Sequence, residues 1–188
     1  MDVLKMYEEK QALLRGYFLL SSGLCSDVYL QSALVLQYPE IAEKFGQALA
    51  NKVRSLNIQV VISPAMGGLF IGHEVARALG ARSLFVERNK EGQFELRRNF
   101  QIYPGERVLI VEDVVTTGKS TQEVIDVLLK LEGQLVGTCS IIDRAEKEPN
   151  FKVPYFSLAK VKARTFSREE LPAGVVPVKP GSREEKKS

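Results

Sequence analysis

The chain has 188 residues, which is enough for one well-buried α/β domain and too few for a second full domain. Its net charge of +3 is too small to indicate binding to nucleic acid or to a membrane, although it suits small anionic ligands. One histidine and two distant cysteines argue against a zinc site or a histidine-based triad. No signal-peptide pattern is present, so we expect a cytoplasmic protein with free thiols.

The first part of the chain predicts a helix followed by two short extended segments. Residues 2–14 read as an amphipathic helix that ends near Gly16. Residues 17–20 and 28–36 are apolar and rich in β-branched and aromatic side chains, which is typical of strands around a polar turn. A proline then opens a helix that we expect to cover residues 39–56.

The rest of the chain alternates between apolar strands and amphipathic helices, which favours a parallel sheet covered on both faces. A polar stretch between residues 87 and 107 suggests a mobile hairpin, and the charged tail from Ser182 suggests disorder. We divide the chain into an N-terminal helix and hood (1–38), a core (39–165) and a tail (166–188). The expected strands are 59–63, 83–87, 107–111 and 134–142, and the expected helices are 68–79 and 119–131.

The segment VLIVEDVVTTGKST, residues 108–121, carries the strongest functional signal. An apolar strand delivers two carboxylates to its carboxyl end, where ligands bind in such sheets, and a turn rich in hydroxyls and glycine opens a helix. Backbone N–H groups at a helix start can bind phosphate, and carboxylates can accept hydrogen bonds from a sugar diol or hold a hydrated divalent cation. A Walker A loop is excluded because Asp113 stands where that motif needs glycine. The alternative is a solvated strand end followed by a helix cap.

This segment resembles the phosphoribosyl-pyrophosphate fingerprint of the type I phosphoribosyltransferases: four apolar residues, two acidic residues and a Thr-Thr-Gly turn. The resemblance implies their fold, a central mostly parallel sheet flanked by helices with a small N-terminal hood. It also implies that Glu112 and Asp113 hold the ribose hydroxyls, act near the reacting centre, and hold Mg²⁺ indirectly through those hydroxyls or water. The expected donor-binding residues of this turn are Val114, Val115, Thr116, Thr117, Gly118, Lys119 and Ser120.

Two further loops are expected to bind the pyrophosphate. Ala65, Met66 and Gly67 lie in a turn that in this family contains a non-proline cis peptide and receives the pyrophosphate. Taken alone, this pattern is equally typical of an ordinary strand-to-helix turn. Arg88 and Lys90 begin the polar hairpin, which is either a solvated basic loop or a lid whose cations neutralise the leaving group, with Lys90 as a catalytic residue. Because family lids often act across a dimer interface, we expect a homodimer that shares its lid.

The accepted base is expected to be orotate. The segment FLLSSG at residues 18–23, followed by Ser26 and Tyr29, resembles the hood of the orotate phosphoribosyltransferases, and implies that Ser22 and Gly23 contact the base. Arg144 ends a strand, where the family places a guanidinium that pairs with the orotate carboxylate, with Thr116 nearby. The reaction implied is the transfer of phosphoribose from its pyrophosphate to orotate in pyrimidine synthesis.

The sequence departs from many of these relatives in its cationic residues. Ser21 and Gly67 occupy positions that often carry lysine, and the lid has no histidine. Two other functions stay open: an enzyme that uses uracil or a purine, and a non-catalytic regulator that senses phosphoribosyl pyrophosphate while binding nucleic acid. A regulator of that kind would need an added DNA-binding module or a basic face, which the residues before the sheet do not show.

Overall fold

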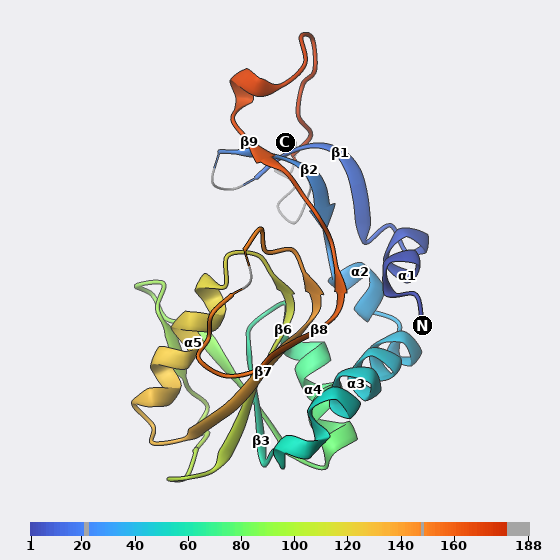
Figure 1. Ribbon diagram of the computed structural model, residues 1–188. Helices are drawn as coiled ribbons and strands as arrows, with labels where there is room; N and C mark the ends of the chain where they lie inside the picture. Colours follow the sequence, from blue (N-terminus) through green and yellow to red (C-terminus); the bar gives the residue numbers. More distant parts are fainter. Residues whose placement is uncertain (21–22, 148, 180–188) are drawn as a thin grey trace, which may run out of the picture.

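A six-stranded sheet forms the centre of the molecule, in a computed structural model that describes residues 1–20, 23–147 and 149–179 (Figure 1). Its order is β5-β4-β3-β6-β7-β8, and every neighbouring pair is parallel except β4 with β5. The strands are β3 (Val60–Pro64), β4 (Arg82–Arg88), β5 (Phe94–Leu96), β6 (Arg107–Val115), β7 (Gln134–Asp143) and β8 (Tyr155–Lys160). The fold class predicted from the sequence is confirmed.

Helices cover both faces of this sheet because its central strands are apolar on both sides. Val61 and Leu109 point to one face, where α3 (Pro39–Val53) and α4 (Leu69–Leu79) pack against them. Their chain neighbours Val60 and Val108 point to the other face and pack against α5 (Lys119–Leu129), as the alternation along a strand requires. A short 3₁₀ turn, η1 (Arg54–Leu56), follows α3. Helices thereby cover both faces of the sheet, so ligands can reach it only at the ends of the strands.

The hood is a second, three-stranded antiparallel sheet that lies over the carboxyl ends of the central strands (Figure 1). It consists of β1 (Leu13–Leu19), β2 (Cys25–Leu30) and β9 (Thr165–Phe166), and Val178 adds a further bridge beside Phe18. The helices α1 (Val3–Glu9) and α2 (Ala33–Leu36) join the hood to the core, and the turn η2 (Arg168–Glu170) follows β9. Residues from both ends of the chain therefore build the hood.

Two of the elements expected near the N-terminus were wrong. The helix stops at Glu9, because Gln11 takes a left-handed backbone angle (φ 55°) and β1 begins at Leu13. The apolar residues Leu13 and Leu14 fit the spacing of a helix as well as that of a strand. Only their pairing with β2 shows that they belong to a strand. The extended segment expected at 28–36 ends at Leu30, and residues 33–36 form the helical turn α2.

Two strands of the core also differ from expectation. Strand β6 continues to Val115 instead of ending at Val111, because Glu112, Val114 and Val115 pair with β7. Strand β8 was missed; it lies at the edge of the sheet and is only partly buried. The polar stretch after β4 does form a hairpin, in which β5 pairs with β4. The tail from Ser182 lies outside the described residues.

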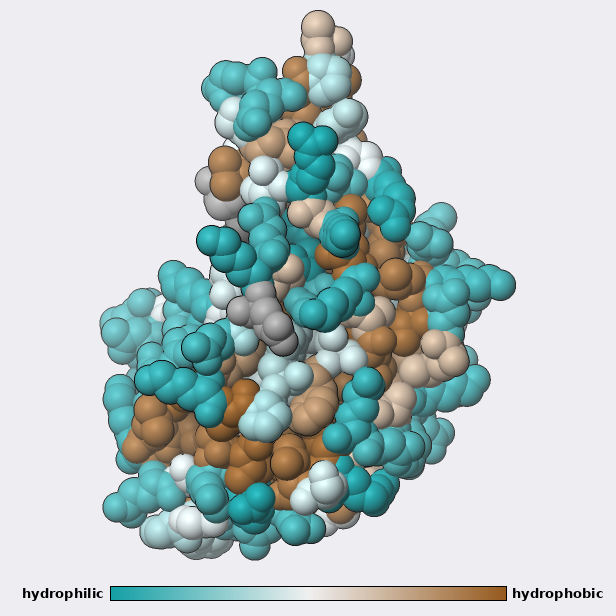
Figure 2. Space-filling model, viewed as in Figure 1, coloured by the Kyte–Doolittle hydropathy of each residue, from teal (hydrophilic) through white to brown (hydrophobic). Residues whose placement is uncertain are grey.

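In this view hydrophobic residues reach the surface over the lower part of the core and along the right-hand side at mid-height, and polar residues cover most of the rest (Figure 2). Among the described residues, no helix combines the length and apolar character needed to cross a bilayer. Both cysteines are free thiols buried in the protein, as expected.

Candidate active site

The acidic pair lies near the end of β6 and is largely shielded from water. Glu112 is 6% exposed and Asp113 is half-buried. Burial, together with the neighbouring Asp113 carboxylate, raises the pKa of Glu112 to about 9. Burial also raises the pKa of Asp113, while hydrogen bonds from Ser32 and from backbone N–H groups oppose that rise. Burying two neighbouring carboxyl groups destabilises the folded protein when no ligand is bound. Carboxyl groups with raised pKa values of this kind are common at functional sites.

The two carboxylates leave β6 on opposite faces. Glu112 follows the alternation of Val108 and Ile110, whose side chains pack on the α5 side of the sheet. Asp113 follows Leu109 and Val111, which pack on the side of α3 and α4. The pair therefore does not form one acidic cluster, and no group of three or more potential metal-binding side chains occurs in the described parts of the chain.

The turn after β6 brings hydroxyls and backbone N–H groups to the start of α5. Gly118 has a left-handed backbone angle (φ 76°), and a Cβ there would lie 3.0 Å from the ring of Phe151, so only glycine fits without strain. The Lys119 N–H donates to Thr117 Oγ1 over 3.3 Å. Thr116, Thr117, Lys119 and Ser120 are exposed at this helix start, which has the geometry of a phosphate-binding turn.

The loop between β3 and α4 lies directly beside the acidic pair. Its Ala65–Met66 peptide bond is cis, and Met66 is exposed. A Cβ placed on Gly67 would lie only 2.8 Å from Asp113 Oδ1, so this glycine lets the loop backbone approach the carboxylate. The fold thus places the loop that is expected to bind pyrophosphate beside the residues that are expected to bind ribose.

Arg144 follows β7 and lies between the core and the hood. Its backbone N–H donates to the Val115 carbonyl over 2.8 Å, and its Nη2 donates to Ser26 Oγ of β2 over 2.6 Å. Its buried Nε has no hydrogen-bond partner among the described residues, and burial lowers the pKa of the guanidinium. An anion at this position would supply the missing acceptor and the missing charge.

One pocket of about 380 Å³ is lined both by residues that are expected to bind the donor and by the arginine that is expected to bind orotate. Thr116 and Thr117 of the phosphate turn line it together with Arg144, and Thr165 of the hood closes one side. Glu146 and Lys147, which sequence reasoning did not single out, also line this pocket. No local motif identifies these two residues, because they follow a strand in an irregular loop.

The hairpin residues lie further along the same edge of the sheet. Arg88 stacks over the ring of Phe94 and donates to Glu123 Oε2 of α5 over 2.7 Å. Lys90 is exposed near the tip. Arg97 and Arg98 both pair with Glu87, so these two arginines are engaged within the hairpin. The structure thus places Arg88 beside α5 and leaves the role of Lys90 a prediction.

The hood contributes a turn and a serine to the neighbourhood of the site. Gly23 (φ 85°) closes the turn between β1 and β2, where its N–H donates to the Leu20 carbonyl over 3.0 Å. Ser22 and Ser21, on which part of the prediction rests, lie outside the described residues. Sequence reasoning listed Ser26 as part of a motif and missed its contact with Arg144, which joins residues 118 positions apart.

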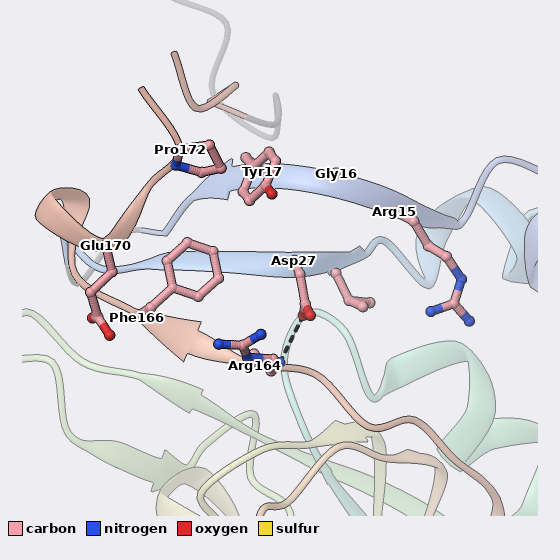
Figure 3. Close-up of a pocket in the computed structure, with 9 residues that line it drawn as sticks. Arg15, Gly16, Tyr17, Asp27, Arg164, Phe166, Glu170 and Pro172 are labelled. Carbon is pink, nitrogen blue, oxygen red and sulfur yellow. Dashed lines mark hydrogen bonds between the residues drawn. The ribbon is translucent and has the colours of Figure 1, made fainter. Parts of the chain in front are cut away.

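A second hollow, of about 510 Å³, lies on the hood itself and contains none of the predicted site residues (Figure 3). Arg15 and Tyr17 of β1, Asp27 of β2 and Phe166 of β9 line it. The Arg164 N–H donates to the Asp27 carboxylate over 2.7 Å, which ties β9 to β2. These contacts hold the hood sheet together.

Comparisons with known proteins show the family of the chain. The family model of the phosphoribosyl transferase domain matches residues 33–172. The orotate phosphoribosyltransferase of Caldanaerobacter subterraneus is 47% identical over 184 residues, which cover 96% of each chain. The orotate phosphoribosyltransferase of Erythrobacter litoralis is 48% identical over 188 residues, or 97% of each chain.

Solved structures show the same fold. The crystal structure of orotate phosphoribosyltransferase from Aeropyrum pernix aligns with a TM-score of 0.70 and 26% identity, over 85% of this chain and 93% of that one. An adenine phosphoribosyltransferase aligns with a TM-score of 0.63 and 21% identity over 81% of this chain and 98% of that one, a likeness in fold alone. The chain therefore belongs to the phosphoribosyltransferase family and, by its likeness over nearly its whole length, to the orotate phosphoribosyltransferases within it.

Proposed function

We propose that this protein transfers the phosphoribosyl group of phosphoribosyl pyrophosphate to orotate, giving orotidine 5′-phosphate and pyrophosphate. The observation that carries the proposal is the shared pocket of Thr116 and Arg144. A phosphate-binding turn and a guanidinium without a full set of acceptors line one space, which suits a ligand with a phosphate at one end and a carboxylate at the other. In the proposed reaction the donor supplies the phosphate and orotate supplies the carboxylate, and the names of the similar enzymes state these two groups, orotate and phosphoribosyl.

The donor would bind across three loops. The start of α5, residues 116–120, would bind the 5-phosphate through N–H groups and hydroxyls, with Val114 and Val115 leading into the turn. Glu112 and Asp113 would accept hydrogen bonds from the ribose hydroxyls. Residues 65–67 lie against Asp113 and would receive the pyrophosphate, with Arg88 and Lys90 of the hairpin above it.

The residues present fit a magnesium ion that is bound mainly by the substrate. Mg²⁺ commonly takes one or two carboxylates together with substrate phosphates and water, and the site offers the carboxylates of Glu112 and Asp113, which belong to no group of three potential ligands in the described parts of the chain. When bound, the ion would offset the negative charge that builds up on the departing pyrophosphate. Glu112 and Asp113 would hold it indirectly, through the ribose hydroxyls or water.

Catalysis would then come from positioning and electrostatics. The bond from ribose C1′ to the pyrophosphate oxygen breaks, and the electron pair leaves with pyrophosphate. A ring nitrogen of orotate forms the new bond to C1′ and gives up its proton to water. Arg144 would fix the orotate carboxylate, with Thr116, Ser22 and Gly23 around the base. The hood would limit access of water to the reacting carbon. A cytoplasmic homodimer that shares its lid is part of the same proposal.

Loss of orotate absorbance, measured with phosphoribosyl pyrophosphate and Mg²⁺, tests the function. Orotate should be consumed, and uracil, hypoxanthine and adenine should not. Preference for one of those three bases would refute the assignment of orotate, and dependence on nucleic acid with no turnover would favour a regulator.

Replacing Arg144 tests how orotate is recognised. Arg144→Ala should raise the KM for orotate by roughly 10- to 100-fold, because a charge-assisted contact is lost, and should leave the KM for the donor within about threefold. Arg144→Lys keeps the charge but loses the planar fork and should recover only part of the affinity. Lys147→Ala, which removes another cation from the pocket, is the control; an equal effect there would contradict the specific role of Arg144.

A further inference from the structure

Ser26 of β2 is a fully buried serine at the junction between the hood and the core. Its Oγ accepts a hydrogen bond from Arg144 Nη2 over 2.6 Å, although the two residues lie 118 positions apart in the chain. Thr165 pairs directly with Ser26 across the hood sheet, and residues opposite each other in antiparallel strands point to the same face. Because Thr165 lines the pocket that Arg144 also lines, Ser26 reaches the guanidinium from the hood side of that pocket.

The Ser26 hydroxyl has its whole hydrogen-bonding capacity in use. It donates to the Val28 carbonyl over 2.9 Å and accepts from the Val28 N–H over 3.2 Å. A serine hydroxyl has one hydrogen and two lone pairs, so the second lone pair is the one that accepts from Arg144. The contacts with Val28 therefore fix the direction in which Ser26 offers its acceptor to the guanidinium.

The Arg144 residue is held at both of its ends. Its backbone N–H donates to the Val115 carbonyl over 2.8 Å, which ties it to the end of β6, directly before Thr116. Its tip is held by Ser26, while its buried Nε has no hydrogen-bond partner among the described residues. A guanidinium carries five N–H donors in one plane, so a contact at Nη2 restricts the orientation of the whole plane and leaves further donors for a ligand.

We propose that Ser26 is a positioning residue for orotate, because it holds the Arg144 guanidinium in the orientation that binds the orotate carboxylate. This inference rests on the proposed function, in which Arg144 pairs with that carboxylate. Without the acceptor at Ser26, Nη2 would lose its link to the hood and the side chain would turn among several rotamers. Orotate would then have to order the guanidinium on binding, which weakens binding because two parallel hydrogen bonds need a fixed geometry.

Steady-state kinetics of Ser26→Ala test the proposal. The KM for orotate should rise about three- to tenfold, and the KM for phosphoribosyl pyrophosphate should stay within about twofold, since only a hydrogen bond to the orotate-binding arginine is lost. Ser26→Cys, assayed under reducing conditions, fills the same space with a weak acceptor and should show the same split, which keeps the test open if the alanine variant does not fold. An unchanged KM for orotate, or an equal rise in both KM values, would overturn the proposal.

A double-mutant cycle tests whether Ser26 acts through Arg144. In an Arg144→Ala background, Ser26→Ala should change the KM for orotate by less than about twofold, because the group that it positions is already absent. Effects of the two substitutions that simply multiply would mean that Ser26 acts by another route, which would contradict the proposal.

The matched control is Ser140→Ala. Ser140 is also fully buried in a strand, and its Oγ donates to the carbonyl two residues later, that of Ile142, over 2.9 Å, as Ser26 does to Val28. Its hydroxyl contacts Tyr155 instead of Arg144. The KM for orotate should therefore stay within about twofold in this variant. A rise equal to that of Ser26→Ala would show that loss of any buried serine hydroxyl suffices, which would refute a specific role of Ser26.

Calorimetric binding of two nucleotides separates failure of this inference from failure of the proposed function. Orotidine 5′-phosphate carries the carboxylate on its base, and uridine 5′-phosphate is the same nucleotide without it. The wild type should bind the first more tightly; Ser26→Ala should weaken that binding about three- to tenfold and leave the binding of uridine 5′-phosphate unchanged. A wild type that binds both equally would refute the proposed base and the inference with it. A preference for orotidine 5′-phosphate that persists undiminished in Ser26→Ala would overturn the inference alone.

Discussion

Replacing Glu112 with glutamine should stabilise the ligand-free protein, and the gain should grow as the pH rises. Glu112 is 6% exposed, and burial, with the adjacent Asp113 carboxylate, raises its pKa from 4.5 to about 9. Glutamine has nearly the same shape and never has to ionise. The variant thus keeps the packing of the side chain and removes its titration.

The direction in which stability changes with pH follows from the number of protons that the folded and unfolded states bind. The unfolded chain releases the proton near the ordinary pKa of 4.5, whereas the folded protein keeps it until about pH 9. Between these values the folded state binds one more proton, so its stability falls as the pH rises, by at most about 1.4 kcal/mol per pH unit. This contribution is fully present below pH 4.5 and is lost on the way to pH 9.

The expected difference between the two proteins is measurable. From pH 6 to pH 8 the wild type should lose about 1–2 kcal/mol relative to Glu112→Gln, since coupling to Asp113 and local relaxation reduce the full effect. For a chain of this length that corresponds to roughly 2–8 °C in Tm. Thermal unfolding followed by circular dichroism from pH 5 to pH 8.5, without Mg²⁺ or donor, gives the comparison.

Glu91→Gln serves as the control, because that glutamate is exposed on the hairpin and its replacement should give a curve parallel to the wild type. A gap between wild type and Glu112→Gln that stays constant across the whole pH range would refute the reasoning. It would mean that Glu112 ionises normally in the folded protein.

Three substitutions test the neighbouring contacts. Asp113→Asn should lower kcat on the order of 100-fold at saturating substrates, because the ribose and metal contacts lose their charge; near-normal turnover would contradict this role. Gly67→Ala should raise the KM for the donor several-fold, because its Cβ displaces the Asp113 carboxylate, whereas an unchanged KM would show that the loop yields freely. Gly118→Ala should lower the unfolding free energy by about 1–3 kcal/mol, measured in urea, because φ is 76° and Phe151 lies 3.0 Å from the new Cβ.

The core of the fold could be predicted because each element there has a periodic pattern of its own. Helices α3, α4 and α5 begin and end within a few residues of the predicted positions, since proline, glycine and the apolar spacing mark them. The extension of β6 to Val115 could not be predicted, because acidic residues disfavour a strand and only the pairing with β7 overrides this. Strand β8 was not predicted because it is a half-buried edge strand, whose hydrophobic pattern is weak.

The candidate site could be predicted only as separate motifs. The sequence identified the phosphate turn and Arg144 as separate features, but their common pocket depends on the parallel neighbours β6 and β7. The hydrogen bonds of Arg144 with Ser26 and of Tyr7 with Ser32 join residues without any shared motif. Such contacts arise from the placement of the hood over the sheet, which no local pattern encodes.

A structure of the protein with phosphoribosyl pyrophosphate and Mg²⁺ tests the central claim most directly. We expect the 5-phosphate at the start of α5, within hydrogen-bonding distance of residues 116–120, and the ribose hydroxyls beside Glu112 and Asp113. A donor bound elsewhere, with this turn and the acidic pair left without contacts to it, would contradict the account.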